Sequence, residues 1–279
     1  MATWEFTALV WFGSLCAGFL GALTGLGGGV VIVPLLTLAF GVDLHYAIGA
    51  SLVTVICTSS GAAAAYVKEG FSNVRIGLFL EIATTIGALF GAFIAAHVSS
   101  GAIAIVFGIV LMYSAVMTTR PQHHDESGGV QASALATKLR LNGDYPGKDG
   151  KVAYNVTHVP LGFGMMFGAG TLSGLLGIGS GVVKVLAMDQ AMRIPFKVST
   201  TTSNFMIGVT AAASAGVYLS RGYIDPVIAM PVVLGVLAGS MFGAKILVKA
   251  KTKVLRRVFA IAIGAVAIEM IYKGISGKI

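Results

Sequence analysis

The residue with the most distinctive chemistry is Lys184, a single cation inside an apolar run of the chain. A lysine inside a membrane-like segment is energetically expensive and usually faces a cavity or a charged partner. Lys184 therefore predicts a functional charge, which either attracts an anionic ligand or pairs with a carboxylate that carries a proton. The alternative is a structural side chain that extends to the membrane surface.

Lys184 directly follows a glycine-rich stretch, and a matching stretch occurs in the first half of the chain. The candidate binding residues of the two stretches are Gly25, Gly27, Gly28, Gly29, Gly177, Gly179, Ser180 and Gly181. Glycine costs about 1 kcal/mol relative to alanine inside a helix, so this density predicts a break in each helix. The helix that starts after a break presents unpaired N–H groups and the positive end of its dipole to an anion. Close packing of helices through small residues is the alternative, and it fits residues 87–92 and 239–244 well.

Hydroxyl, amide and carboxylate side chains in the neighbouring apolar segments complete the candidate site. Donors suited to the oxygens of sulfite or a sulfonate are Ser51, Thr54, Thr202, Ser203 and Asn204. Their alternative role is hydrogen bonding to helix carbonyls. Glu81 and Glu269 are the remaining acids well inside apolar segments, and each is a secondary candidate for proton coupling.

No catalytic motif accompanies these residues. Gly177–Gly181 resembles the turn around a serine nucleophile, but no base is evident. The His and Cys residues do not pair at helical spacing, and His123 to Glu126 are expected to be a solvated linker. The sequence therefore predicts no enzyme, no cofactor and no metal site.

Composition defines the surroundings of the candidate site. Of 279 residues, 56% are hydrophobic and 11% are charged, whereas a soluble domain has about 25% charged residues. The chain is therefore expected to be an all-helical, multi-pass membrane protein that contacts lipid. Its net charge of +8 reflects membrane topology rather than a nucleic-acid partner.

A repeat organises the apolar segments. They are expected near 7–24, 28–41, 46–66, 74–96 and 101–118, and then near 160–176, 180–191, 198–219, 225–244 and 257–273. The two sets align without gaps at a shift of 152, which pairs Gly25 with Gly177 and Tyr66 with Tyr218. Segments 28–41 and 180–191 are too short to cross, because about 14 helical residues reach only ~21 Å of a ~30 Å core. We expect an N-terminal repeat over 1–118, a linker over 119–157 and a C-terminal repeat over 158–279.

The positive-inside rule separates two topologies. Eight spans would leave ten Lys and Arg residues inside and eight outside. If each glycine stretch is instead the turn of a re-entrant hairpin, fifteen lie inside, and only Arg221, Lys273 and Lys278 lie outside. The second count predicts two inverted repeats, each with one glycine-turn hairpin and three spanning helices. In the linker, the alternation of residues 138–141 and 151–156 around a turn-rich 144–150 predicts a small cytoplasmic β-hairpin.

The doubled glycine motif, Gly25-x-Gly27-Gly28-Gly29 and Gly177-x-Gly179-x-Gly181, resembles the TauE/SafE family over nearly the whole chain. Small and hydroxyl residues follow both copies, at 47–54 and 199–204. The resemblance implies export of sulfite or an organosulfonate across the plasma membrane. This chain departs from the pattern at Ser180, Lys184 and Leu186.

We therefore expect a secondary transporter, an exporter that moves a small sulfur-containing anion by alternating access. A passive anion channel, or a membrane subunit or enzyme without transport, is the alternative. The sequence does not give the coupling ion or the direction of transport. It also leaves the oligomeric state open, with a homodimer among the options.

Overall fold

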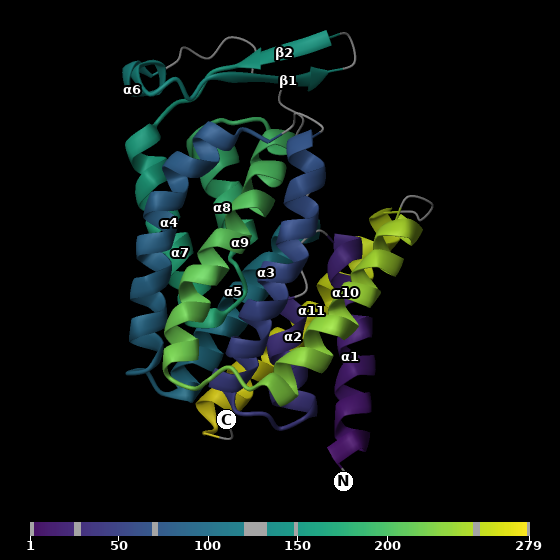
Figure 1. Ribbon diagram of the computed structural model, residues 1–279. Helices are drawn as coiled ribbons and strands as arrows, with labels where there is room; N and C mark the ends of the chain where they lie inside the picture. Colours follow the sequence, from purple (N-terminus) through teal and green to yellow (C-terminus); the bar gives the residue numbers. More distant parts are fainter. Residues whose placement is uncertain are drawn as a thin grey trace.

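Long helices make up most of the computed structural model, which describes residues 3–24, 29–68, 72–119, 133–147, 150–247 and 252–277 (Figure 1). The elements of the first half are α1 (Thr3–Thr24), α2 (Gly29–Pro34), the π-helix η1 (Leu35–Ala39), α3 (Leu44–Lys68), α4 (Val74–Ala95) and α5 (Ser100–Thr119). The linker contains α6 (Ala134–Lys138), β1 (Gly143–Gly147) and β2 (Gly150–Tyr154). The second half contains α7 (Val159–Leu176), α8 (Gly181–Leu186), the π-helix η2 (Ala187–Ala191), α9 (Phe196–Ser220), α10 (Pro226–Leu247) and α11 (Thr252–Ile275).

Element bounds recur at the offset found in the sequence. α2, η1, α3 and α4 begin and end 152 residues before α8, η2, α9 and α10. The π-helical turn follows Pro34 in the first half and Leu186 in the second. A proline is therefore not the cause of that turn, because the same geometry forms without one.

The second glycine stretch turns the chain back on itself. Gly177 and Gly179 have φ values of 68° and 70°, and Ser180 has a φ of 41°, so the helix is interrupted between α7 and α8. α8 and η2 then return beside α7, since the Thr157 N–H donates to the Met192 carbonyl at 3.1 Å. These residues confirm the expected helix break and form a helical hairpin that enters and leaves at one end of the bundle.

The chain also turns back on itself in the first half. The rings of Phe6, near the start of α1, and Phe40, after η1, lie 6.0 Å apart between centroids. Of the first glycine stretch, Gly29 begins α2, whereas Gly25, Gly27 and Gly28 lie outside the described residues.

The two hairpins open toward opposite ends of the helical bundle. β1, β2 and α6 cover one end, which we call the sheet end, and both chain termini lie at the other, the terminal end (Figure 1). The α7–α8 hairpin opens at the sheet end, where Thr157 meets Met192. The α1–α2 hairpin opens at the terminal end, where Phe40 precedes the start of α3.

Helices of the first half pack on helices of the second half. The closest pairings are α1 with α10, α4 with α7, α5 with α11 and α3 with α9. On α4, a Cβ added at Gly87 or Gly91 would collide with the carbonyl oxygens of Phe167 or Thr171 on α7. Glycine is required there because the two backbones touch. The packing role predicted for residues 87–92 is confirmed at these two positions.

The outer face of α4 is apolar and exposed. Large side chains on that face are Leu78, Ile82, Ile86, Leu89 and Phe93. Their spacing of three or four residues places them on one stripe, opposite the buried Leu80, Thr84 and Ala88. Within the described residues, α4 and α7 are both long and apolar enough to cross a membrane. The stripe fits a helix that faces lipid on one side and protein on the other.

The linker forms a β-hairpin, but not in the predicted register. Lys138 ends α6 and residues 139–141 form the turn after it, whereas the first strand runs over Gly143–Gly147 and includes part of the predicted turn. The alternation of Leu139 and Leu141 does not reflect a strand, because their N–H groups donate to the Leu135 and Ala136 carbonyls at the end of the helix. Pro146 is tolerated in β1 because a two-stranded sheet leaves one side of each strand unpaired.

Candidate functional site

Lys184 lies in the interior of the protein. Its side chain has no exposed surface, and Nζ donates a hydrogen bond to the Thr210 hydroxyl at 2.5 Å. The turn at Gly179 and Ser180 sets the direction of α8, and Lys184 lies in the last turn of that short helix. The glycine break therefore turns a short helix toward α9 and buries its cation there.

Thr210 connects Lys184 to the buried Glu81. The Thr210 oxygen lies 2.7 Å from Glu81 Oε1 and 2.9 Å from the Met206 carbonyl oxygen. Thr85 also donates to Oε1 at 3.1 Å. A hydroxyl has only one hydrogen, so Thr210 can donate fully to either Glu81 or Met206, but not to both.

Glu81 has spare hydrogen-bonding capacity. Its residue is only 6% exposed, and Oε2 has no hydrogen-bond partner within the described part of the chain. Glu81 lies about 10 Å along the axis from the first residue of α4. An ionised carboxylate so far inside requires compensation by an opposite charge, and Lys184 supplies it through Thr210.

This network, Glu81–Thr210–Lys184, joins the two halves of the protein. Glu81 comes from α4 in the first half, whereas Lys184 and Thr210 come from α8 and α9 in the second. At the 152-residue offset, the corresponding residues are Val233, Thr58 and Ile32. Thr58 donates to the Thr54 carbonyl in its own helix, and Ile32 is fully buried. The threonine is common to both halves, but the acid occurs only in the first half and the lysine only in the second.

The two glycine stretches meet at Ser51. The Ser51 hydroxyl lies 2.8 Å from the Gly177 carbonyl oxygen and 3.3 Å from that of Gly29. In the second half, the Ser203 hydroxyl donates to the Gly181 carbonyl at 3.3 Å, which matches the bond from Ser51 to Gly29. The structure thus brings Ser51 to Gly29 and Gly177, and Ser203 to Gly181, with both hydroxyls donated to backbone carbonyls.

Other candidate residues make local contacts. The Ser180 hydroxyl bonds to the Ala169 carbonyl on α7, and Thr54 bonds to the Ala50 carbonyl in its own helix. Thr202 accepts a hydrogen bond from the Asn73 N–H at 3.0 Å, near the sheet end. Asn204 is half-buried on α9. These side chains position backbone segments in this conformation.

Glu269 lies apart from this network. It is exposed on α11, where Oε1 pairs with Lys273 Nζ at 3.5 Å, one helical turn away. Of the two acids considered for proton coupling, the structure therefore brings only Glu81 to Lys184. Thr210 is not among the residues predicted from the sequence, although it recurs as Thr58 at the 152-residue offset.

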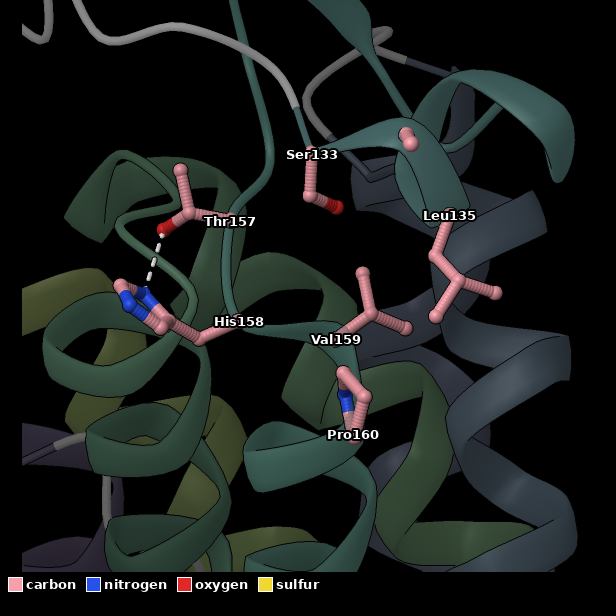
Figure 2. A pocket seen from close by; sticks show the side chains of 7 residues that line it. Ser133, Leu135, Thr157, His158, Val159 and Pro160 are labelled. Carbon is pink, nitrogen blue, oxygen red and sulfur yellow. Dashed lines mark hydrogen bonds between the residues drawn. The ribbon is translucent and has the colours of Figure 1, made fainter.

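An open groove of about 470 Å³ lies at the sheet end, away from this network (Figure 2). It is lined by Ser133, Ala134, Leu135, Thr157, His158, Val159 and Pro160, from α6 and the start of α7. His158 Nδ1 bonds to the Thr157 hydroxyl at 3.2 Å along its edge. Its lining is mostly apolar and includes none of the candidate binding or coupling residues. In the described part of the chain, no group of three His, Cys, Asp or Glu side chains could hold a metal ion.

Comparison with known proteins identifies the kind of molecule to which this site belongs. The probable membrane transporter protein YunE of Bacillus subtilis (strain 168) is 30% identical over 97% of this chain and 99% of the relative. The probable membrane transporter protein YdhB of the same organism is 28% identical over 82% of this chain and 83% of the relative. A probable membrane transporter protein of Methanocaldococcus jannaschii is 27% identical over 91% of both chains.

No solved structure matches the chain significantly. The family described as Sulfite exporter TauE/SafE matches residues 10–270. Its relatives are named as membrane transporters, which agrees with the expectation that the chain is not an enzyme. This protein belongs to the TauE/SafE family of integral membrane transporters.

Proposed function

We propose that this protein is a secondary transporter, an exporter that moves a small anion containing oxidised sulfur, sulfite or an organosulfonate, by alternating access. The observation that carries the proposal is the buried Lys184, a cation just beyond the point where two glycine turns meet. A cation inside a transporter attracts an anion, and the printed name of the family suggests sulfite.

The proposed path passes between the two hairpins. Ser51 and Ser203 are already bonded to carbonyls of the glycine stretches, so a small movement of one hairpin would turn these hydroxyls toward a bound oxyanion. Thr54, Thr202 and Asn204 lie on the same two helices, α3 and α9. Alternating access would then be a rocking of α1–α10 against α4–α7, the two tightest pairings of the bundle.

We further propose inverted repeats, with the sheet end in the cytoplasm and both termini outside. Two features support this orientation. The hairpins open toward opposite ends, and the sheet end carries the exposed basic residues Arg75, Lys138, Arg140, Lys151, Arg193 and Lys197. The terminal end carries Arg221 and Lys273. Basic residues concentrate on the cytoplasmic side of membrane proteins.

Purified protein in lipid vesicles tests this function. Vesicles loaded with unlabelled sulfite or sulfoacetate should exchange it for external ³⁵S-labelled anion, with a rate that saturates as concentration rises. Taurine, which has no net charge, and acetate, which has no sulfur, should exchange at least tenfold more slowly. Lys184→Ala should reduce exchange strongly while the protein remains monodisperse.

Two outcomes would contradict the proposal. Flux that rises linearly with concentration and follows the membrane potential would indicate a passive channel. No flux of any anion in the panel would indicate a membrane subunit without transport of its own.

A further inference from the structure

Glu81 and a transported anion would compete for the same cation. The described hydrogen bonds of Glu81 are to Thr85 and Thr210, and Lys184 is bonded to the same Thr210 oxygen. When the site is empty, one negative and one positive charge lie in a water-excluded region. When an anion arrives at Lys184, two negative charges would share one cation.

We propose that Glu81 takes up one proton whenever an anion binds Lys184, so that anion and proton cross the membrane together in the same direction. Export by such a symporter is driven by the outward gradient of the anion and, for a dianion, by the membrane potential, against the inward proton gradient. This inference rests on the proposed transport function and adds its coupling ion and stoichiometry. The physical reason is that two like charges held close together in a low-dielectric site cannot both remain ionised. Of the two negative groups, the carboxylate of Glu81 is the one that can be neutralised by water-borne protons.

Thr210 has the geometry for this exchange. In the empty state, its hydrogen points to Glu81 Oε1, which is ionised. A proton from the water-filled side then converts the Glu81 carboxylate to a carboxylic acid. The Thr210 hydrogen can turn to the Met206 carbonyl oxygen, 2.9 Å away, while its oxygen accepts the new O–H of Glu81. Every hydrogen remains bonded, and the Lys184 ammonium is released to the anion without losing its own proton.

The unpartnered oxygen of Glu81 is the second observation that points to a proton. Oε2 is buried and unbonded within the described residues, which is costly for an ionised oxygen and is removed when the group becomes a neutral acid. Thr85 and Thr210 hold the carboxyl by Oε1. Once Oε1 carries the proton and donates it to Thr210, the unbonded Oε2 is the carbonyl oxygen of a neutral acid and no longer shares a negative charge.

No other charged group described near the network substitutes for Glu81 or Lys184. α7, which packs on α4, has no ionisable side chain between Val159 and Leu176. The ionisable groups described on the other adjoining elements are Arg75 on α4, Asp189 on η2, Lys197 and Tyr218 on α9, Arg221 directly after α9, and His45, Tyr46 and Cys57 on α3. The residues of α9 lie toward its two ends, and Thr210 lies between them.

The test measures protons and anions in the same vesicles. Full-length protein is reconstituted with a pH-sensitive dye inside, and the membrane potential is held at zero with potassium and valinomycin. ³⁵S-labelled sulfoacetate or sulfite is added outside. With the outside one pH unit more acidic, wild-type protein should concentrate sulfoacetate about tenfold, the factor expected for one proton per anion.

Glu81→Gln is the decisive variant, because glutamine resembles the protonated acid and keeps an oxygen for Thr85 and Thr210. The number of protons moved per anion should fall by about one relative to wild type, with either anion, and the accumulation ratio should fall to about one. Glu269→Gln, which removes an exposed carboxylate on α11, is the matched control and should keep the wild-type ratio.

The outcomes separate this inference from the transport function. If wild-type protein exchanges the anion but moves no protons beyond those that the anion itself carries, the coupling is refuted and the transport function stands. An unchanged proton ratio in Glu81→Gln would do the same. If Glu81→Gln cannot be purified, the wild-type measurement still decides, and no anion flux at all would refute both proposals.

Discussion

At the residue scale, a single hydroxyl hydrogen distinguishes two states of the interior. Thr210 lies between an acid and a carbonyl at nearly equal distances, 2.7 and 2.9 Å. Which acceptor it bonds depends on the charge of Glu81, and that charge depends on what Lys184 faces. Thr210 is uncharged, and it links the charged side chains of Glu81 and Lys184.

The two charged residues differ in how well the sequence predicts them. Lys184 was predicted because a lone cation in an apolar run is conspicuous. Glu81 could not be ranked above Glu269, because both are single acids in apolar helices. Only the packing of α4 between α7 and α9 buries Glu81, whereas Glu269 faces outward on α11.

Removal of Lys184 should destabilise the protein through Glu81. Lys184→Met leaves a buried carboxylate uncompensated, which typically costs about 3–5 kcal/mol. Glu81→Gln combined with Lys184→Met should recover most of that loss, because the buried charge is gone. Thermal unfolding in detergent at neutral pH measures both.

Lys273→Met is the control for this pair of variants. It breaks a half-exposed Lys–Glu pair on α11 and should change stability by no more than about 1 kcal/mol. If Lys184→Met and the double variant unfold at the same temperature, Glu81 and Lys184 do not compensate each other.

At the element scale, glycine has two separate roles in this fold. On α4 and α7, glycine lets two straight helices touch, as at Gly170 and Gly174, where an added Cβ would meet the carbonyls of Thr84 and Ala88. At Gly177 and Gly179, positive φ values let the chain reverse. Spacing in the sequence separated the two roles, because four-residue intervals fit packing and dense clusters fit a break. The strand register of the linker was predicted wrongly, since alternation over four residues cannot distinguish a strand from a capped helical turn.

A matched pair of alanine substitutions on α7 tests the packing role. Gly170→Ala should destabilise the protein by about 1–3 kcal/mol, because the new methyl group has no room against α4. Gly168→Ala, two residues earlier, has open space around it and should stabilise α7 by up to about 1 kcal/mol. Unfolding midpoints give the comparison, and equal effects at the two positions would contradict the close contact.

Asn73 connects α4 to the β-hairpin and offers a second pair of variants. Its Oδ1 accepts the Ile76 N–H at 3.1 Å and caps α4, while Nδ2 donates to the Tyr154 hydroxyl at 2.7 Å and to the Leu141 carbonyl. Burial raises the pKa of the Tyr154 phenol to about 12, so that hydroxyl is neutral at physiological pH.

Asn73→Ser should keep the cap and lose the two donated bonds, because the serine side chain is too short to reach Tyr154, so amide exchange should rise in β2 but not in the first turn of α4. Asn73→Ala should raise exchange in both and cost about 0.5–2 kcal/mol. Hydrogen–deuterium exchange followed by mass spectrometry resolves the two segments. Equal protection of β2 in the wild type and Asn73→Ser would mean that the hairpin is held elsewhere.

At the scale of the whole molecule, the arrangement of the halves was the most predictable feature. The offset of 152 in the sequence reappears in the bounds of α2, α3 and α4 and their counterparts. The contacts between halves were not predictable, because hydropathy shows that a helix is apolar but not which helix it touches. Lys249 and Lys251, two of the fifteen basic residues placed inside by the hairpin topology, lie outside the described residues.

Cysteine labelling tests the proposed orientation at described positions. In a background with Cys16 and Cys57 replaced by alanine, Asp43→Cys at the terminal end should react with an impermeant maleimide in intact cells. Lys151→Cys, on the exposed β2 strand, should react only after permeabilisation. The opposite pattern would invert the orientation, and labelling of both sites from outside would place the two ends on one side.

Glu81 and Lys184 are charged, whereas Val233 and Ile32, which occupy the corresponding positions in the other half, are not. This difference limits how such a protein can be assembled. An assembly of two identical half-length chains would repeat every residue, so it could hold two such cations or none. When the two halves are joined in one polypeptide, each half can acquire substitutions that the other half does not have. One solitary lysine near the meeting point of two similar hairpins is therefore a property that the fused chain can have and that two identical half-length chains cannot.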